Sequence, residues 1–323
     1  MPDYHIKRIG AADFPTLIPL MKDCFGMDVN IDYFHWKYID NPAGHFIGFV
    51  AIHPETGEVG AYYGVIPQRF FIDGKEQVVY QSCDTMTHSK HRRLGLFKLL
   101  AFACYDYLEE SKELFVIGFG GNQSTPGFLK FGWKQVFDVK YYFKPSPACL
   151  AGHIRRYPDQ YFVEDKELKQ LPVLLKKQPA FPGIISGRTV EHIRWRTSNP
   201  NYQYRIICYK PGQQAEGYII YYILNGKLIL FDFLFETGKA EKALFWYLYA
   251  QVVQHKYKGI IAFCQENGQQ SELLRRHYFM SNPFNKGPLS EKTPFIFYAP
   301  ADILNRYSDA SSWQISSYDH DAL

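Results

Sequence analysis

Hydrophobic side chains recur at two different spacings along the first half of the chain, and the two spacings alternate. Apolar residues at every second position predict strands, whereas apolar residues three and four positions apart predict helices. The helical spacing covers residues 13–25, 32–39 and 96–107, and a short helix follows residue 122. The predicted strands are residues 4–9, 45–53, 59–71, 78–83, 114–119 and 135–143. This alternation predicts an α/β fold with a mixed central sheet.

The second half repeats part of this pattern. Residues 192–200 resemble residues 34–42, and residues 267–279 resemble residues 122–133. Between the two later segments lie predicted strands at 204–208, 216–224, 227–235 and 259–264 and a predicted helix at 240–255. We therefore expect two tandem copies of one fold. The expected parts are a first domain at 1–145, a proline-punctuated linker with short helices at 146–187, a second domain at 188–300 and a tail at 301–323.

Length and composition fit this organisation. A chain of 323 residues favours about two domains, and a hydrophobic content of 46% is typical of a globular protein. The net charge of +4 is small and scattered, so we expect no nucleic-acid partner. No apolar run is long enough to span a bilayer, and the first residues lack the apolar core of a signal peptide. The six cysteines are widely spaced, so we expect reduced thiols, a cytoplasmic location and no membrane partner.

The stretch from Thr85 to Leu100 carries the clearest chemical signal. It leads from a strand into a helix through a loop that contains Arg92, Arg93 and Gly95. The first N–H groups of a helix have no partner within the helix, and the helix dipole adds positive potential there. Such a turn suits a phosphate or pyrophosphate, and a glycine lets the backbone approach the ligand closely.

The order Arg92-x-x-Gly95-x-Phe97 resembles motif A of the GNAT superfamily of N-acetyltransferases, whose amides hold the pyrophosphate of acetyl-coenzyme A. Phe97 departs from the Gly or Ala of that motif. A second segment resembles motif B of the same superfamily, with a strand, then Asn122, a short helix and an aromatic ending at Trp133. Two motifs at this separation are more specific than either alone. The resemblance implies a GNAT acetyltransferase fold in tandem, as in bacterial tandem-GNAT proteins, with a degenerate second copy.

The resemblance also implies where the coenzyme lies. Its pantetheine arm would run beside Met86 and Thr87, whose backbone groups would hold the arm and polarise the thioester carbonyl. The residues expected to contact acetyl-coenzyme A are Met86, Thr87, Arg92, Arg93, Leu94, Gly95, Leu96, Phe97, Asn122, Ser124 and Phe128. Asn122 and Ser124 have an equally good alternative as caps of the helix that follows them.

The proton-transfer groups are less clearly indicated. Asp84 is the carboxylate nearest to the expected thioester and is the candidate general base, although a purely structural aspartate is an equal alternative. Gln81 and Cys83 share its strand but are poor bases near neutral pH. Phe128 stands where many relatives have a tyrosine, and phenylalanine has no proton to give. Tyr141 and Tyr142 remain candidates for the general acid.

Two further features argue against additional ligands. His88 and His91 are three residues apart on a loop with basic neighbours, so we expect no metal site there. In the second copy the helix entry contains Glu236 and no Arg-x-x-Gly. A carboxylate at that place would repel a phosphate, so we expect no coenzyme there.

Together, the residues and the resemblance predict an N-acetyltransferase that moves an acetyl group from acetyl-coenzyme A to a small-molecule amine by direct attack. The resemblance includes proteins of bacterial surface-polysaccharide synthesis, so an amino sugar or a sugar nucleotide is the first acceptor to consider. A small amine or a peptide N-terminus stays open. So do another acyl donor (a longer acyl-coenzyme A or an aminoacyl-tRNA) and a non-catalytic acyl-coenzyme A-binding or assembly protein. The sequence indicates no oligomeric state.

Overall fold

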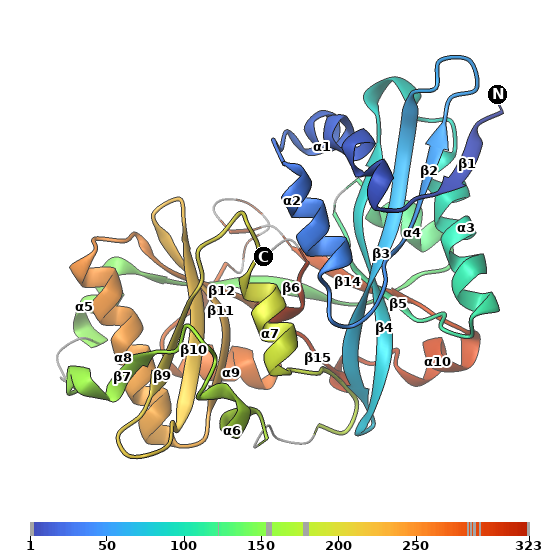
Figure 1. Ribbon diagram of the computed structural model, residues 1–323. Helices are drawn as coiled ribbons and strands as arrows, with labels where there is room; N and C mark the ends of the chain where they lie inside the picture. Colours follow the sequence, from blue (N-terminus) through green and yellow to red (C-terminus); the bar gives the residue numbers. More distant parts are fainter. Residues whose placement is uncertain are drawn as a thin grey trace. The chain divides into compact units, whose positions relative to one another are not determined.

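The molecule has two compact units, and each is built from segments that lie apart in the sequence (Figure 1). The computed structural model describes residues 3–121, 123–152, 157–176, 181–282, 284, 286, 289–290 and 292–321. The first unit consists of Met1–Val136, Asn199–Asn201 and Pro294–Ala310. The second unit consists of Phe137–Ser198, Tyr202–Thr293 and Ser311–Leu323. Each unit combines a sheet with helices, as the α/β pattern of the sequence predicts.

The sheet of the first unit has the order β1-β2-β3-β4-β5-β14. Neighbouring strands run antiparallel except β4 and β5, which are parallel and are joined by helix α3. The strands are β1 (His5–Arg8), β2 (Ile47–Ile52), β3 (Val59–Ile72), β4 (Lys75–Thr87), β5 (Val116–Phe119) and β14 (Thr293–Tyr298). The helices are η1 (Ala11–Thr16), α1 (Leu17–Phe25), α2 (Ile31–Phe34), η2 (His35–Ile39), η3 (Ser89–His91), α3 (Leu96–Glu110), α4 (Thr125–Lys130) and α10 (Ala301–Arg306).

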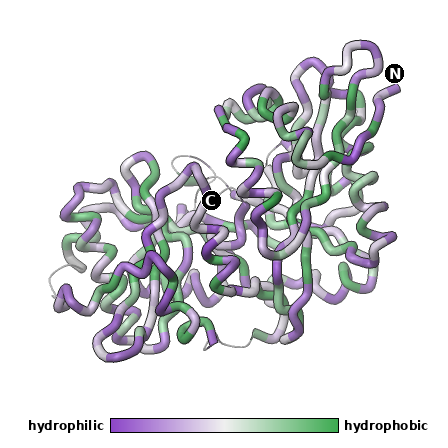
Figure 2. The backbone as a smooth tube through the Cα atoms, in the orientation of Figure 1, coloured by the Kyte–Doolittle hydropathy of each residue, from purple (hydrophilic) through white to green (hydrophobic). Residues whose placement is uncertain are grey.

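Helix α3 packs one apolar face on this sheet. Leu100, Cys104 and Leu108, at helical spacing, are fully buried, whereas Leu99 on the opposite face is exposed. Hydrophobic and hydrophilic residues accordingly alternate along the helix (Figure 2). Near its middle, the Tyr105 hydroxyl accepts a 2.8 Å hydrogen bond from Trp133 Nε1 and so satisfies a buried indole. This packing fixes the start of α3 against the end of β4.

Strand β14 completes the first sheet from the far end of the sequence. Phe295, Ile296 and Phe297 are fully buried, and Phe295 pairs with Phe119 in an antiparallel register. Residues 294–310 therefore belong to the first unit, whereas the sequence placed them in the second domain and the tail. An apolar strand pattern predicts that a segment pairs but not which strand it pairs with.

The sheet of the second unit has the order β6-β12-β11-β10-β9-β7. Its strands are β6 (Lys134–Pro145), β7 (Phe162–Glu164), β9 (Arg205–Tyr209), β10 (Gly217–Leu224), β11 (Lys227–Phe235) and β12 (Gly259–Gln265), with β13 (Met280–Ser281) beside β6 and β8 (Ile184–Ser186) beside β15 (Trp313–Gln314). Its helices are α5 (Ser146–Gly152), η4 (Asp159–Tyr161), α6 (Leu171–Leu175), α7 (Val190–Thr197), α8 (Gly238–Gln254), α9 (Gln269–Arg276), η5 (Ala310–Ser312) and η6 (Ser317–Asp319).

Both faces of this second sheet are buried. On β10, Ile219 and Tyr221 face a core that includes helix α8, whereas Tyr218 and Ile220 face a core that includes Tyr318. Such two-sided burial explains why β10 reads as a continuous apolar run rather than as an alternating one.

The segment expected to be a linker, and the expected tail from residue 311 onward, belong to the second unit. Strand β7 pairs with β9, and Leu171 and Leu174 of α6 are fully buried. Strand β15 pairs with β8, and Trp313 and Tyr318 are buried. The prolines of the 146–187 segment thus punctuate short elements that pack on a core. The boundaries at 145, 187 and 300 differ from those of the compact units for this reason.

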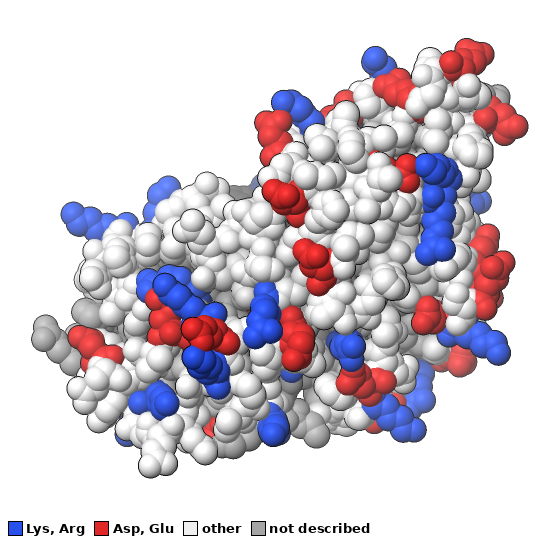
Figure 3. Space-filling view, in the orientation of Figure 1, with Lys and Arg blue, Asp and Glu red and all other residues white. Residues whose placement is uncertain are grey.

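Charged side chains of both signs are intermixed on the face seen in Figure 3, and Lys and Arg do not gather into one basic area there. Among the described residues, no helix has both the length and the apolar composition needed to cross a bilayer.

Candidate active site

Strand β4 changes its partners where it approaches α3. It pairs with β5 from Tyr80 to Ser82, and beyond Ser82 the described residues give it no partner on that side. On its other side the register with β3 shifts, because Asp84 and Thr85 together oppose one residue of β3. Asp84 has a φ of +48°, in the left-handed region. A bulge of this kind bends a strand and re-aims its backbone groups.

A cavity of about 550 Å³ opens at this free edge of β4. One wall is formed by Thr85 and Thr87, whose side chains alternate with the buried Met86. Other walls come from the end of α1, the start of α3 and the start of α4. The remaining lining residues are Cys24, Phe25, His91, Arg92, Arg93, Gly95, Leu96, Phe97, Lys98, Gln123, Ser124 and Phe131.

The start of α3 offers backbone N–H groups to this cavity. Gly95 precedes the helix with a φ of +74°, and no side chain of the described part of the chain caps the helix. A Cβ atom at Gly95 would meet no described atom within 4 Å, so the space above it is open. Arg92, Arg93 and Lys98 add positive charge, and the first turn of α3 holds no acidic residue. An uncapped helix start with basic neighbours suits a pyrophosphate.

Phe97 replaces a small residue of the resembled motif, and Gly127 makes room for it. The Phe97 ring packs 4.9 Å from that of Phe128 and 5.0 Å from that of Phe131. A Cβ atom at Gly127 would lie 2.8 Å from the Phe97 ring. The large residue on α3 is therefore accommodated by a glycine on α4.

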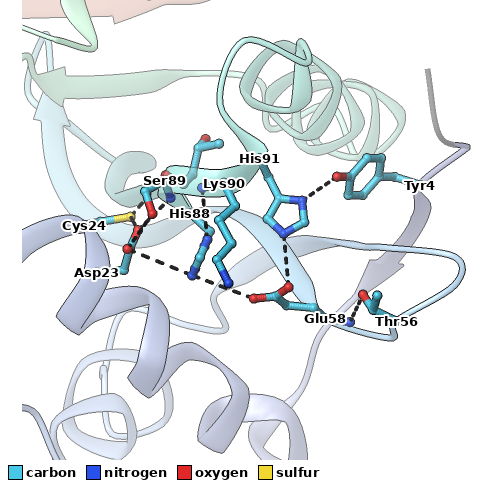
Figure 4. Close-up of polar contacts among 10 residues, drawn as sticks. Tyr4, Asp23, Cys24, Thr56, Glu58, His88, Ser89, Lys90 and His91 are labelled. Atoms are coloured by element: carbon cyan, nitrogen blue, oxygen red, sulfur yellow. Dashed lines mark hydrogen bonds and ion pairs between the residues drawn. The ribbon is translucent and has the colours of Figure 1, made fainter.

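The loop before the helix is held by two carboxylates from other elements (Figure 4). Asp23 of α1 accepts from the Ser89 N–H at 2.7 Å and from the Ser89 hydroxyl at 2.8 Å. Glu58 precedes β3, and its Oε2 lies 3.3 Å from His91 Nε2. The other ring nitrogen of His91, Nδ1, lies 2.6 Å from the Tyr4 hydroxyl. The Ser89 N–H is the main cause of a lowered pKa at Asp23, and the His91 hydrogen bond is the main cause of a lowered pKa at Glu58.

The Asp84 carboxylate points into a polar cluster rather than into the cavity lining. Oδ1 accepts from Lys37 Nζ at 2.9 Å, and Oδ2 accepts from the Tyr38 hydroxyl at 2.7 Å. Lys37 is almost completely buried, and the helical turn that carries it is a π-turn (His35–Ile39). These contacts hold the left-handed residue in the bulge.

The structure brings together most of the coenzyme contacts expected from the sequence. Thr87, Arg92, Arg93, Gly95, Leu96, Phe97 and Ser124 line one cavity. Met86 and Phe128 have their side chains in the core, so only the backbone of Met86 can face a ligand, and Leu94 is not part of the lining. Asn122 lies outside the described residues.

Sequence reasoning missed the contributions of α1. Cys24 and Phe25 end that helix and line the cavity, and Cys24 Sγ lies 3.4 Å from the Thr87 carbonyl oxygen. Burial is the main cause of a raised pKa at the Cys24 thiol. Nothing in the local pattern near residue 24 marks a ligand site, since its apolar residues fit an ordinary amphipathic helix.

Comparison with known proteins agrees with this geometry. Residues 5–136 match the family model described as an acetyltransferase (GNAT) domain. No curated protein sequence matches the chain.

Solved structures with similar folds cover nearly the whole chain. A probable N-acyltransferase from Enterococcus faecalis, described as a conserved protein of unknown function, shares 13% identity over 92% of this chain and 72% of its own, with a TM-score of 0.70. A GCN5-related N-acetyltransferase from Anabaena variabilis shares 13% identity over 91% and 73%, with a TM-score of 0.67. N-myristoyltransferase from Saccharomyces cerevisiae, solved with myristoyl-CoA, shares 14% identity over 93% and 79%, with a TM-score of 0.63.

At these identities the structural neighbours establish the fold, and the family model establishes the relationship of the first unit. The free edge of β4, its bulge and the uncapped start of α3 lie within the matched residues. Residues 5–136 therefore match the GNAT acetyltransferase domain family, and the fold of the chain is similar to that of GNAT acetyltransferases.

Proposed function

We propose that this protein transfers an acetyl group from acetyl-coenzyme A to the amine of a small-molecule acceptor. The observation that carries the proposal is one cavity that joins the uncapped, basic start of α3 to the free edge of β4. The first feature suits a pyrophosphate. The second leaves backbone N–H and C=O groups without strand partners in the described residues, which suits an extended chain with amide groups.

The reaction that this arrangement supports is a direct attack. With the pyrophosphate at Arg92–Leu96 and the arm beside Thr85–Thr87, the thioester carbon would lie near the bulge. The amine nitrogen forms a bond to that carbon, the carbon–sulfur bond breaks, and the coenzyme leaves as a thiolate. A cysteine acyl intermediate is disfavoured, because Cys83 is buried and burial raises the pKa of Cys24.

The general base remains a proposal. Asp84 is the candidate, but both of its carboxylate oxygens already accept hydrogen bonds from Lys37 and Tyr38. To take a proton from the amine, Asp84 would have to use the second lone pair of an oxygen that already accepts one of these bonds. A water molecule that relays the proton is the alternative. Phe128 cannot act as a general acid, and neither Tyr141 nor Tyr142 lines the cavity, so the thiolate would leave unprotonated or take its proton from solvent.

The acceptor is proposed as an amino sugar or a sugar nucleotide, with small amines and peptide N-termini as other classes to test. A longer acyl donor is the second candidate. It is favoured by the likeness of the fold to that of N-myristoyltransferase solved with myristoyl-CoA. The cavity has apolar walls at Phe25 and Phe131, which an acyl chain could contact.

A thermal-shift panel distinguishes these candidates. We expect acetyl-coenzyme A to raise the unfolding midpoint, because a ligand at 100 times its Kd stabilises the folded state by about 2.7 kcal/mol. Myristoyl-CoA that stabilises better than acetyl-coenzyme A would favour the longer donor, and aminoacyl-tRNA is the third member of the panel. Release of free thiol is then followed against a panel of amines. Binding without thiol release for any amine would favour a non-catalytic acyl-coenzyme A-binding protein.

A further inference from the structure

Three potential metal ligands meet at the loop that leads into α3 (Figure 4). The proposed acyl transfer gives none of them a chemical role, although His91 also lines the cavity. Their ligand atoms, one each from Glu58, His88 and His91, all lie within 4.8 Å of one another. We propose that these three residues bind a divalent first-row transition metal of the Zn²⁺ type. The spacing of the two histidines alone argues against such a site, and the third ligand comes from a hairpin far earlier in the chain.

The distances are close to those that a bound ion requires. Glu58 Oε2 lies 3.3 Å from His91 Nε2, and Glu58 Oε1 lies 3.7 Å from His88 Nε2. Tetrahedral ligands at about 2.0–2.2 Å from zinc are separated from one another by about 3.3–3.5 Å. Only small side-chain movements would therefore bring the three atoms onto one ion. The exposed Glu58 leaves a solvent side on which water completes the coordination.

A further polar group orients one of the histidines. In the metal-free protein the His91 Nε2–H faces Glu58, and a metal at Nε2 would replace that proton. The Tyr4 hydroxyl, 2.6 Å from His91 Nδ1, can then accept a proton carried on Nδ1. Partners of this kind on the second ring nitrogen fix the orientation and tautomer of metal-binding histidines. His91 is buried, so this orientation is held by packing as well.

The charge and the chemistry of the cluster select the class of ion. Glu58 supplies one negative charge, and Asp23, with Oδ1 4.0 Å from His88 Nε2, supplies a second nearby. Two carboxylates balance a divalent cation. Two imidazole nitrogens with one carboxylate suit Zn²⁺, Co²⁺ or Ni²⁺, whereas Mg²⁺ and Ca²⁺ prefer oxygen ligands alone.

His88 limits how tightly the ion is held. Its Nδ1 accepts the Lys90 N–H at 3.2 Å, so in the metal-free protein the neutral ring carries its proton on Nε2. Metal binding at Nε2 moves that proton to Nδ1 and breaks this one exposed hydrogen bond. The positive side chains of Lys90 and Arg92 lie on the same loop and oppose a cation. We therefore expect a dissociation constant in the micromolar range rather than the nanomolar range.

The test measures metal binding directly, without acyl-coenzyme A. Tag-free protein is stripped with a chelator, dialysed and titrated with Zn²⁺ by calorimetry and with Co²⁺ by visible absorption. We expect one equivalent of each ion to bind, and no heat from Mg²⁺. Glu58→Gln should weaken binding at least tenfold. The matched control His45→Gln, which removes an exposed histidine outside the cluster, should bind as the unaltered protein does.

The proposal fails if no stoichiometric binding occurs, or if Glu58→Gln and His91→Asn bind the metal as tightly as the unaltered protein. Glu58 is exposed, so its variant should fold, and circular dichroism checks that it does. Because no coenzyme is present in the titration, a negative result leaves the acyltransferase assignment untouched. A positive result has one further consequence: saturating Zn²⁺, by linking the hairpin to the loop, should change acyl-coenzyme A affinity, and the coenzyme should change Zn²⁺ affinity by the same factor.

Discussion

The two units share the same order of strands and helices but differ at the turn that precedes the crossover helix. In the first unit the order β2-β3-β4-α3-β5-α4 forms the site, and in the second the order β9-β10-β11-α8-β12-α9 repeats it. In both, the parallel pair of strands separates after three paired positions, at Ser82 in β4 and at Leu230 in β11. Each of these strands also carries a register shift next to an aspartate, at Asp84 and at Asp232.

The aspartates at the two bulges are held alike. Asp84 accepts from Lys37 and from Tyr38, whereas Asp232 accepts from Arg188 Nε at 3.0 Å and from the Tyr218 hydroxyl at 2.7 Å. One basic residue and one tyrosine thus satisfy each buried carboxylate. This similarity indicates that the paired aspartate belongs to the architecture of the bulge, whatever it does in the reaction.

The starts of the two crossover helices differ in what they offer a ligand. Helix α8 begins after Thr237, whose hydroxyl caps the Ala240 N–H at 3.1 Å, and Glu241 lies in its first turn. Helix α3 begins after Gly95 and, among the described residues, has neither a side-chain cap nor an acid in its first turn. A helix start that caps itself and carries a carboxylate has little to offer a phosphate. Because both units share the separating strands, the comparison supports the proposal that the turn before α3 decides which unit binds the coenzyme.

Removal of either bulge aspartate should give the largest effect. Because a buried ion pair that loses one partner leaves a charge without compensation, Asp84→Asn and Asp232→Asn should each lower the free energy of unfolding by about 3–5 kcal/mol. Chemical denaturation checks this value. Turnover of the folded fraction should fall for Asp84→Asn only.

Turnover of the folded protein separates support from catalysis at Asp84. If Asp84 is the base, kcat of folded Asp84→Asn should fall by about 10²–10⁴-fold while acetyl-coenzyme A affinity stays close to that of the unaltered protein. If Asp84 only holds the bulge, kcat and coenzyme affinity should fall together. An Asp84→Asn protein of unchanged stability would refute the structural role that the two units share.

A glutamate placed at the turn before α3 should give the next largest effect. Gly95→Glu fills the open space above the helix start with a negative charge, so acetyl-coenzyme A affinity should fall at least about 100-fold, or about 3 kcal/mol. The left-handed φ of Gly95 adds about 1–2 kcal/mol of strain, which the fold should survive. Calorimetric titration measures the affinity.

Gly238→Glu is the matched control in the second unit. No described atom lies within 4 Å of a Cβ atom at Gly238, and an acid in the first turn of α8 is favoured by the helix dipole. This variant should bind acetyl-coenzyme A as the unaltered protein does. Weakened binding in Gly238→Glu with normal binding in Gly95→Glu would reverse the assignment of the two turns.

The smallest expected effect is a change in the rate at which Cys24 is alkylated, and this rate reports on the first unit alone. Cys24 is half-buried, whereas the other five cysteines are buried. Because burial raises its pKa, Cys24 should react more slowly with iodoacetamide at pH 8 than an ordinary thiol, and faster as the pH rises. Acetyl-coenzyme A should slow this labelling several-fold by filling the cavity, as followed by mass spectrometry. Equal labelling with and without coenzyme would separate α1 from the site.

The local patterns of the sequence predicted the elements well and their partners poorly. The run from β2 to β5 appears close to where its alternation of apolar residues predicts it, because that alternation reflects burial of one side. The sequence analysis predicts no strand at β14 and places its residues in the second domain, because the consecutive apolar residues Phe295–Phe297 carry no signal for their partner. The prolines of residues 146–187 predict a linker with short helices, and in the structure one of its helices, α6, buries Leu171 and Leu174 in a core.

The part of the candidate site that comes from one continuous segment could be predicted from the sequence. Arg92, Gly95 and Phe97 lie close together on one turn, so the sequence locates the start of α3, where we propose that the pyrophosphate binds. Cys24 and Glu58 reach the same region from other elements, and only the folded chain shows their proximity. The partners of Asp84 could not be predicted either, because a lysine in a helix pattern is usually exposed.

The central claim is that acetyl-coenzyme A binds at the start of α3 in the first unit. A crystal structure with acetyl-coenzyme A tests it most directly. The account predicts pyrophosphate oxygens about 2.7–3.2 Å from the backbone nitrogens around Gly95, with the thioester beside Thr85–Thr87. A pyrophosphate at the start of α8, or a cavity between β4 and α3 that stays empty at saturating coenzyme, would contradict it.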